Sequence, residues 1–225
     1  IRAQPRSRGL GDVYKRQLDP RGYTSREFLY LLGEKLWKET GRDGILTSAY
    51  RANVPIFCPA IADSSIGMGL SQGRHLKPDV GYIDVIGDVI ESTNLVIRRR
   101  RTASIVLGGG TPKNFINQAS VQAEFYCPEI NGHQYALQIV TDVPHYGGAS
   151  GASLSEAQSW GKLSSNADRV TVQADATLVL PLLVSGLVST NSQRKSEAIP
   201  CFDLSSPIMS IEGIPFPKGR YEEHR

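Results

Sequence analysis

Three glycines between an apolar segment and a helix signal constrain this chain more than any other feature. In "SIVLGGGTPKNF" (104–115), the apolar run 104–107 comes directly before glycines 108–110. Thr111 is a good N-cap and Pro112 suits the first position of a helix, so we expect a buried strand, a tight turn and a helix. Backbone N–H groups at such a turn can bind a phosphate. The motif is not the G-x-G-x-x-G fingerprint, and taken alone a plain strand-to-helix turn explains it more simply.

The same alternation of strands and helices extends over most of the chain. A helix is expected from "TSREFLYLLGEKLWKETG", where Thr24 and Glu27 form a capping box and Gly41 marks the end. Further helical patterns cover 84–98 and 176–188, and strand patterns cover 54–60, 135–142 and 169–175. The sequence therefore predicts an α/β protein with a Rossmann-like open, mainly parallel sheet and helices on both faces.

Composition excludes several classes of protein. The chain has 225 residues, which suits one domain or a large part of one, and its net charge of +3 is too small to indicate a nucleic-acid partner. The sequence has neither an apolar run long enough for a membrane span nor a secretory signal. Its cysteines lie far apart and form no Cys/His cluster, so we expect no metal site and a reducing, cytoplasmic location.

The two ends of the chain differ from the rest. Residues 1–17, "IRAQPRSRGLGDVYKRQ", are basic and without helical period, and "GLGDVYKRQ" resembles a translated library-adapter string. We expect this segment to be a non-native scar or a disordered arm that packs against nothing; a natural basic arm is the alternative. Residues 191–225 are polar and aperiodic, and we expect a poorly ordered tail.

Two aspartates follow predicted strands. Asp175 closes "RVTVQAD", and Asp63 lies just beyond "VPIFCPAIA". In open parallel sheets, ligands bind off the carboxyl ends of the strands, where an acidic side chain can accept ribose hydroxyls. A helix cap or a solvated loop aspartate explains each position equally well.

The segment "EAQSWGKL" (156–163) combines residues suited to amine chemistry. Ser153 and Glu156 form a second capping box. Gly161 can end the helix, so that Trp160 and Lys162 turn into one pocket. Desolvation would then free the lysine lone pair for imine formation. The alternative is a packed tryptophan beside a solvated lysine.

Four segments together resemble the deoxyhypusine synthase family: "VPIFCPAIADSSIG", "IVLGGGTPKNFI", "EAQSWGKL" and "VQADATLVLPLLV", in the family's order. The resemblance covers about residues 19–187 and implies that 18–190 form the C-terminal part of an NAD-binding domain. It also implies an NAD-dependent transfer of an aminobutyl group from a polyamine, spermidine in the family, through an enzyme lysine imine. The acceptor would be a translation factor lysine or a small amine. Family members are tetramers, so a homo-oligomer is expected.

The resemblance also implies roles for individual residues. Lys162 falls on the position of the nucleophile. Polyamine-binding positions fall on Glu156, Trp160, Gly147, Gly148 and Asn114. NAD-binding positions fall on Asp63, Gly109, Thr141, Asp142, Asp175 and Ala176.

Three departures from the family pattern concern the polyamine site. Met68 and Ala149 stand where the family has aspartates, and Asn114 stands where it has a histidine. We expect these three residues around one pocket near Lys162, and therefore a donor or acceptor other than spermidine and the translation factor. "GGGTPKNF" resembles the bacterial deoxyhypusine synthase-like branch. The alternative function is a non-catalytic NAD-binding or interaction protein that kept the fold.

Overall fold

The computed structural model describes residues 19–99, 101–143, 153–190, 200–212 and 214–215. Within these ranges the chain divides into two compact units, with boundaries at Asp88/Val89 and at Pro200/Cys201. The sequence predicted one domain over 18–190, whereas the first boundary falls inside a continuous helix. The expectation for residues 1–17 lies outside the described residues.

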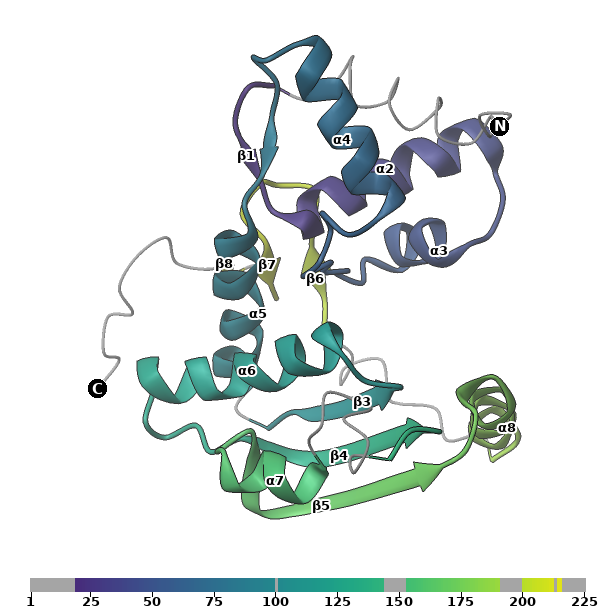
Figure 1. The fold of residues 1–225 in the computed structure, drawn as a ribbon, viewed down its shortest axis with the longest axis vertical. Coiled ribbons are helices and arrows are strands. Elements are labelled where there is room, and N and C mark those ends of the chain that lie inside the picture. Colours follow the sequence, from purple (N-terminus) through teal and green to yellow (C-terminus); the bar gives the residue numbers. More distant parts are fainter. Residues whose placement is uncertain (1–18, 100, 144–152, 191–199, 213, 216–225) are drawn as a thin grey trace. The chain divides into compact units, whose positions relative to one another are not determined.

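The first unit consists mainly of helices (Figure 1). Its elements are β1 (Gly22–Tyr23), α2 (Ser25–Thr40), α3 (Ile45–Ala52), α4 (Ser65–Leu76), β2 (Tyr82–Ile83) and the start of α5 (Val85–Arg99). Strand β1 pairs in parallel with β2. The capping prediction for α2 is confirmed, because Thr24 Oγ1 accepts the Glu27 N–H at 3.1 Å and Gly41 ends the helix at φ 60°. Phe28, Leu29 and Leu32 on this helix form the core of the unit.

The strand predicted for residues 54–60 is wrong. This segment is irregular and mostly half-buried, although its apolar side chains Ile56 and Cys58 do pack against the core. Its prolines lack the N–H group that a strand ladder needs. The Cys58 N–H instead donates to Ser25 Oγ at 2.8 Å.

Part of the tail is structured, which corrects the expectation of poor order over 191–225. Residues 200–212 and 214–215 contain β6 (Phe202–Asp203), β7 (Ser210–Ile211) and β8 (Ile214–Pro215), which form an antiparallel sheet. Leu204 and Met209 are buried, and Arg26 of α2 donates to the carbonyl oxygens of Leu204, Ser206 and Pro207. The tail therefore completes the first unit, which the absence of hydrophobic period did not reveal.

The second unit contains the parallel sheet. Its elements are β3 (Ala103–Leu107), α6 (Thr111–Tyr126), β4 (His133–Val140), α7 (Leu154–Ser159), β5 (Leu163–Gln173) and α8 (Ala176–Ser189). The strands lie in the order β3-β4-β5 and all run parallel, so that their carboxyl ends meet at one edge (Figure 1). The predicted open α/β fold with a parallel sheet is confirmed.

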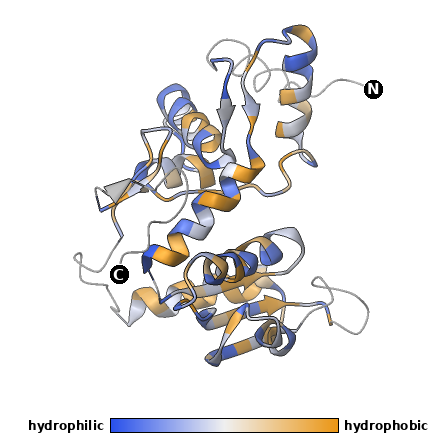
Figure 2. Ribbon diagram, turned by 90° about the vertical axis from the view of Figure 1, so that its left-hand side faces the viewer, coloured by the Kyte–Doolittle hydropathy of each residue, from blue (hydrophilic) through white to orange (hydrophobic). Residues whose placement is uncertain are grey.

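The two faces of this sheet differ. Ser104 and Val106 of β3 are buried, whereas Ile105 and Leu107, which alternate with them, are exposed. Right-handed crossovers in the order β3-β4-β5 place α6 and α7 on the same face. Ala136 of β4 packs there against α7. The opposite face remains apolar and exposed, although Figure 2 shows hydrophobic and hydrophilic residues mixed along most elements.

Candidate functional site

The glycine turn lies at the carboxyl end of β3. Gly108 and Gly110 have φ of +82° and +83°, and a Cβ at either position would meet nothing within 4 Å. The Gly108 N–H donates to the Ile139 carbonyl at 2.8 Å, and Gln138 Nε2 donates to the Gly108 carbonyl at 2.9 Å. The predicted N-cap Thr111 is wrong by one residue, because Gly110 is the N-cap of α6 and supplies no side-chain acceptor. The turn is thus anchored to β4 and open on its outer side.

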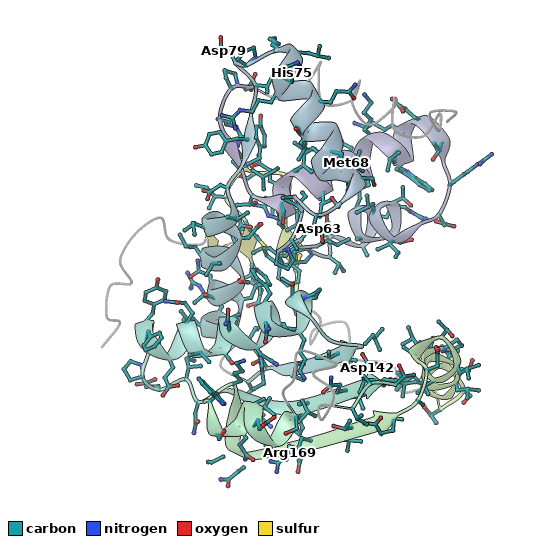
Figure 3. All side chains as sticks on the ribbon, viewed as in Figure 1. Asp63, Met68, His75, Asp79, Asp142 and Arg169 are labelled. Atoms are coloured by element: carbon teal, nitrogen blue, oxygen red, sulfur yellow. The ribbon has the colours of Figure 1, made fainter. Side chains whose placement is uncertain are left out.

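The carboxyl ends of β4 and β5 bring further predicted residues to the same edge. Thr141 and Asp142 follow β4 directly and are exposed; Figure 3 shows Asp142 at the strand tips. Asp175 and Ala176 follow β5. Because Leu107 aligns with Ile139 and Ile139 with Val172, these ends lie level with the glycine turn. The structure therefore brings together Gly109, Thr141, Asp142, Asp175 and Ala176.

Asp175 is the N-cap of α8, as the alternative explanation of its position required. Its Oδ1 accepts the Thr177 N–H at 2.7 Å and the Thr177 hydroxyl at 2.6 Å. The hydroxyl bond, followed by the N–H bond, lowers the pKa of this carboxyl group. Asp175 is thus a carboxylate at neutral pH, and both bonds use the same oxygen.

The segment that carries Lys162 lies at the opposite end of β5. The capping box that opens α7 is confirmed: Ser153 Oγ accepts the Glu156 N–H at 3.1 Å, and Glu156 Oε2 accepts the Ser153 N–H at 2.7 Å. The helix stops before Gly161, whose φ is +71°. The Gly161 N–H donates to the Gln158 carbonyl at 3.1 Å, and the Lys162 N–H donates to the Ala157 carbonyl at 3.0 Å. This is a Schellman ending, so Gly161 ends the helix as predicted.

Three elements hold the main chain of Lys162. Besides the bond to α7, its carbonyl oxygen accepts the Ser120 hydroxyl of α6 at 3.0 Å and the His133 N–H of β4 at 3.2 Å. The residue itself is half-buried. Trp160, by contrast, is 74 % exposed. Within one chain it therefore forms no apolar wall for Lys162, and it is not the packed tryptophan of the alternative either.

Sequence reasoning missed Lys113, the third residue of α6. It is only 2 % exposed. Burial, followed by the positive charge of Lys162, lowers the pKa of Lys113, while the carboxylate of Glu156 opposes this shift. Lys113, Asn117 and Ser120 follow the i, i+4, i+7 spacing of one helix face, and this period was the available signal. A lysine is so rarely buried that the expectation was a solvated side chain.

The structure does not unite the two groups within this unit. Lys162 precedes Leu163, which aligns with His133 at the start of β4, whereas Asp175 follows the far end of β5. Asp63 and Met68 belong to the first unit, and both are exposed (Figure 3). Gly147, Gly148 and Ala149 lie outside the described residues. The predicted pocket around Met68, Asn114 and Ala149 therefore stays a prediction.

Two general searches give negative findings for the described residues. They contain no group of three or more His, Cys, Asp or Glu side chains that is arranged to hold a metal ion. None of the helices in the same parts of the chain is both long and apolar enough to cross a bilayer.

Comparison with known proteins places these motifs in one family. The family model "DS: Deoxyhypusine synthase" matches residues 8–187, which include the sheet, the glycine turn and Lys162. The chain belongs to the deoxyhypusine synthase family. The predicted resemblance is thereby confirmed. The match also includes residues 8–17, which the sequence analysis set apart.

Named relatives support the deoxyhypusine synthase assignment. A "Probable deoxyhypusine synthase 2" of Methanosarcina acetivorans is 48% identical over 73% of this chain and 48% of its own length. The protein of the same name in Methanosarcina mazei is 45% identical over 82% of this chain and 53% of its own length. A "Deoxyhypusine synthase-like protein" of Caulobacter vibrioides is 39% identical over 75% of this chain and 47% of its own length. The chain thus spans about half the length of these relatives.

Proposed function

We propose that the protein is an NAD-dependent aminoalkyl transferase of the deoxyhypusine synthase type, acting through a lysine imine on Lys162. The donor would be a polyamine, and the acceptor a protein lysine, such as that of a translation factor, or a small amine. The observation that carries the proposal is the fixed position of Lys162, whose main chain is bonded to α6, α7 and β4 inside the segment that the family model matches.

The carboxyl edge of the sheet fits an NAD molecule. The turn at Gly108 and Gly110 offers uncapped N–H groups at the start of α6, with open space where side chains would stand. Such N–H groups and the helix dipole favour a pyrophosphate. The Asp175 carboxylate at the neighbouring strand end suits a ribose hydroxyl. Bound there, NAD would supply the hydride acceptor that converts a donor amine into an imine.

Lys162 would carry the transferred group. Its neutral Nζ lone pair attacks the imine carbon, a new C–N bond forms, and the original C–N bond breaks as the departing amine takes up a proton. The acceptor amine then repeats this exchange and releases the lysine. Glu156, one turn earlier on α7, would hold the positive end of the donor, because its carboxylate is fixed by the capping box.

We also propose a homo-oligomer, a tetramer by family resemblance, in the cytoplasm. None of the residues of α8 is buried, and Leu178, Leu182 and Val188 are each more than two-thirds exposed. The sheet face with Ile105 and Leu107 is exposed as well. Large apolar surfaces of this kind favour association. A second copy would also explain how the separated lysine and nucleotide ends could serve one reaction.

The test is covalent trapping in the longest natural form of the protein. The protein is incubated with NAD and a panel of amines, including spermidine, then treated with borohydride, and its peptides are weighed. We expect the alkyl mass on the peptide with Lys162, and its loss in Lys162→Ala with NAD binding retained. Lys38→Ala, at an exposed lysine of α2, is the control and should trap normally. Trapping at another residue, or full trapping in Lys162→Ala, would overturn the proposal.

The second candidate function is a non-catalytic NAD-binding protein. Met68 and Asn114 favour it, because they replace an acid and an imidazole of the family's polyamine site, and a buried ammonium without a partner is costly. NAD binding without trapping by any amine in the panel would support this function. NADH formation with one particular amine would instead identify a changed donor.

A further inference from the structure

A buried lysine lies in the same cluster as Lys162. Lys113 is 2 % exposed on α6, and the face it shares with Ser120 reaches Lys162 through the bond between Ser120 Oγ and the Lys162 carbonyl. Lysine side chains are almost never buried without a specific partner or role. The sequence motifs assign no role to this residue.

We propose that Lys113 is a positioning residue for Lys162: its buried ammonium group opposes a positive charge on the Lys162 amine and so keeps that amine available for attack. The inference rests on the proposed function for its purpose, but not for its physical content. A like charge in a poorly solvated position disfavours the protonated form of its neighbour, and this is a known means of activating a lysine nucleophile.

The electrostatics of Lys113 support the pairing. Burial and then the charge of Lys162 lower the pKa of Lys113, and the Glu156 carboxylate raises it. The interaction between two charges is reciprocal, so whatever Lys162 does to Lys113 is done to Lys162 as well. A second carboxylate stands near: Glu124 Oε2 would lie 3.5 Å from a Cβ added at Gly161. The cluster thus holds two ammonium groups, with carboxylates from α6 and α7 to offset them.

The surroundings also supply a hydrogen-bond acceptor for an ammonium group. Asn117 lies one turn after Lys113 on the same face of α6 and is 1 % exposed. Among the described residues, its Oδ1 accepts no hydrogen bond. A buried amide oxygen is costly to leave unpaired. This oxygen therefore favours a donor, such as the Lys113 ammonium, on that face.

The experiment measures lysine reactivity directly, without NAD or substrate. The protein is labelled with trace acetic anhydride between about pH 6 and pH 11, and acetylation of each lysine is quantified by peptide mass spectrometry. In Lys113→Met we expect labelling of Lys162 at about pH 8 to fall about threefold, because the repulsion that favours the neutral amine is gone. Lys113→Arg keeps the charge and should restore labelling. Lys38→Met, in the first unit, should change nothing.

Two further arms keep the test decisive if Lys113→Met fails to fold. In Lys162→Met, labelling of Lys113 should move to higher pH, and in Glu156→Gln to lower pH. About 1 M salt should reduce the first effect, because it screens the charges. The inference is overturned if Lys113 labels identically with and without Lys162, or if Lys113→Met leaves Lys162 labelling unchanged.

The outcomes also separate this inference from the proposed function. If the labelling depends on Lys113 while borohydride traps nothing on Lys162, the pairing stands and the transferase proposal fails. If trapping occurs on Lys162 at the same rate and with the same pH profile in Lys113→Met, the transferase proposal stands and the pairing fails.

Discussion

The two ends of the β3-β4-β5 sheet are built in opposite ways. At the carboxyl end, Gly108 and Asp175 sit in exposed turns with open space around them. At the amino end, the main chain of Lys162 is held by Ser120, Ala157 and His133 from three different elements. The first arrangement can admit a large ligand by small backbone changes. The second fixes one amine in place, as a residue that must meet a reacting carbon requires.

The largest expected effect compares one glycine from each end. Gly132 has φ +62°, and a Cβ there would lie 2.5 Å from the Leu163 carbonyl carbon, next to Lys162. Gly108 has φ +82° but open space. Both Gly→Ala changes meet the strain of a left-handed backbone, about 1 kcal/mol. Gly132→Ala must also displace the backbone, which adds about 1–3 kcal/mol. Urea unfolding of both variants measures the difference, and equal losses would contradict the comparison.

The second prediction compares two helix caps. Ser153→Ala removes the cap of α7 and should cost about 1 kcal/mol. Asp175→Ala removes the cap of α8 and should also lower the melting temperature. Only Asp175→Ala should weaken NAD binding, by about tenfold, because a carboxylate that accepts a ribose hydroxyl is lost. Titration of NAD into both variants checks this. An equal loss of affinity in both would show that Asp175 acts on the fold alone.

The smallest effect concerns pH at the lysine end. The Thr102 hydroxyl donates to His133 Nδ1 at 2.7 Å, and His133 Nε2–H donates to the Ile116 carbonyl at 3.0 Å. Burial lowers the pKa of His133, and the bond to the Ile116 carbonyl only partly opposes this. The neutral ring is therefore favoured on folding. Its contribution to stability is complete above the unfolded pKa of about 6.5 and is lost as the pH falls from there to the folded pKa.

His133→Gln should therefore be less stable than the wild type at pH 8 and should lose less stability between about pH 7 and pH 5. Thermal unfolding across this range measures the slope. His75→Gln, on α4 of the first unit and exposed, is the matched control and should keep the wild-type slope. A wild-type slope in His133→Gln would show that the acid sensitivity arises elsewhere.

The sequence predicted the carboxyl end better than the amino end because the first is encoded locally. A glycine turn after an apolar run and an aspartate before an apolar helix are short-range signals, and both appear where expected. At the amino end, the capping box of Ser153 and the helix stop at Gly161 are local too. The positions of Lys113 and Ser120 against Lys162 depend on how α6 crosses the sheet, which no local pattern encodes.

The other misses share this physical cause. Residues 54–60 have strand composition, but their prolines cannot join a ladder, so the segment packs without strand structure. Residues 200–212 have no period because short strands bury single side chains, such as Leu204 and Met209. Strand β5 begins earlier than its alternating pattern, since residues from Leu163 join it through an irregular register near His133.

The return of the chain to the first unit has a consequence for the order of folding during synthesis. Arg26 is 1 % exposed and donates to the carbonyl oxygens of Leu204, Ser206 and Pro207. These acceptors leave the ribosome almost last. Domains generally fold as units while the chain emerges, N-terminal ones first. Here the second unit is complete in sequence before the first, so the first begins folding early and closes around Arg26 only after the parallel sheet has been made.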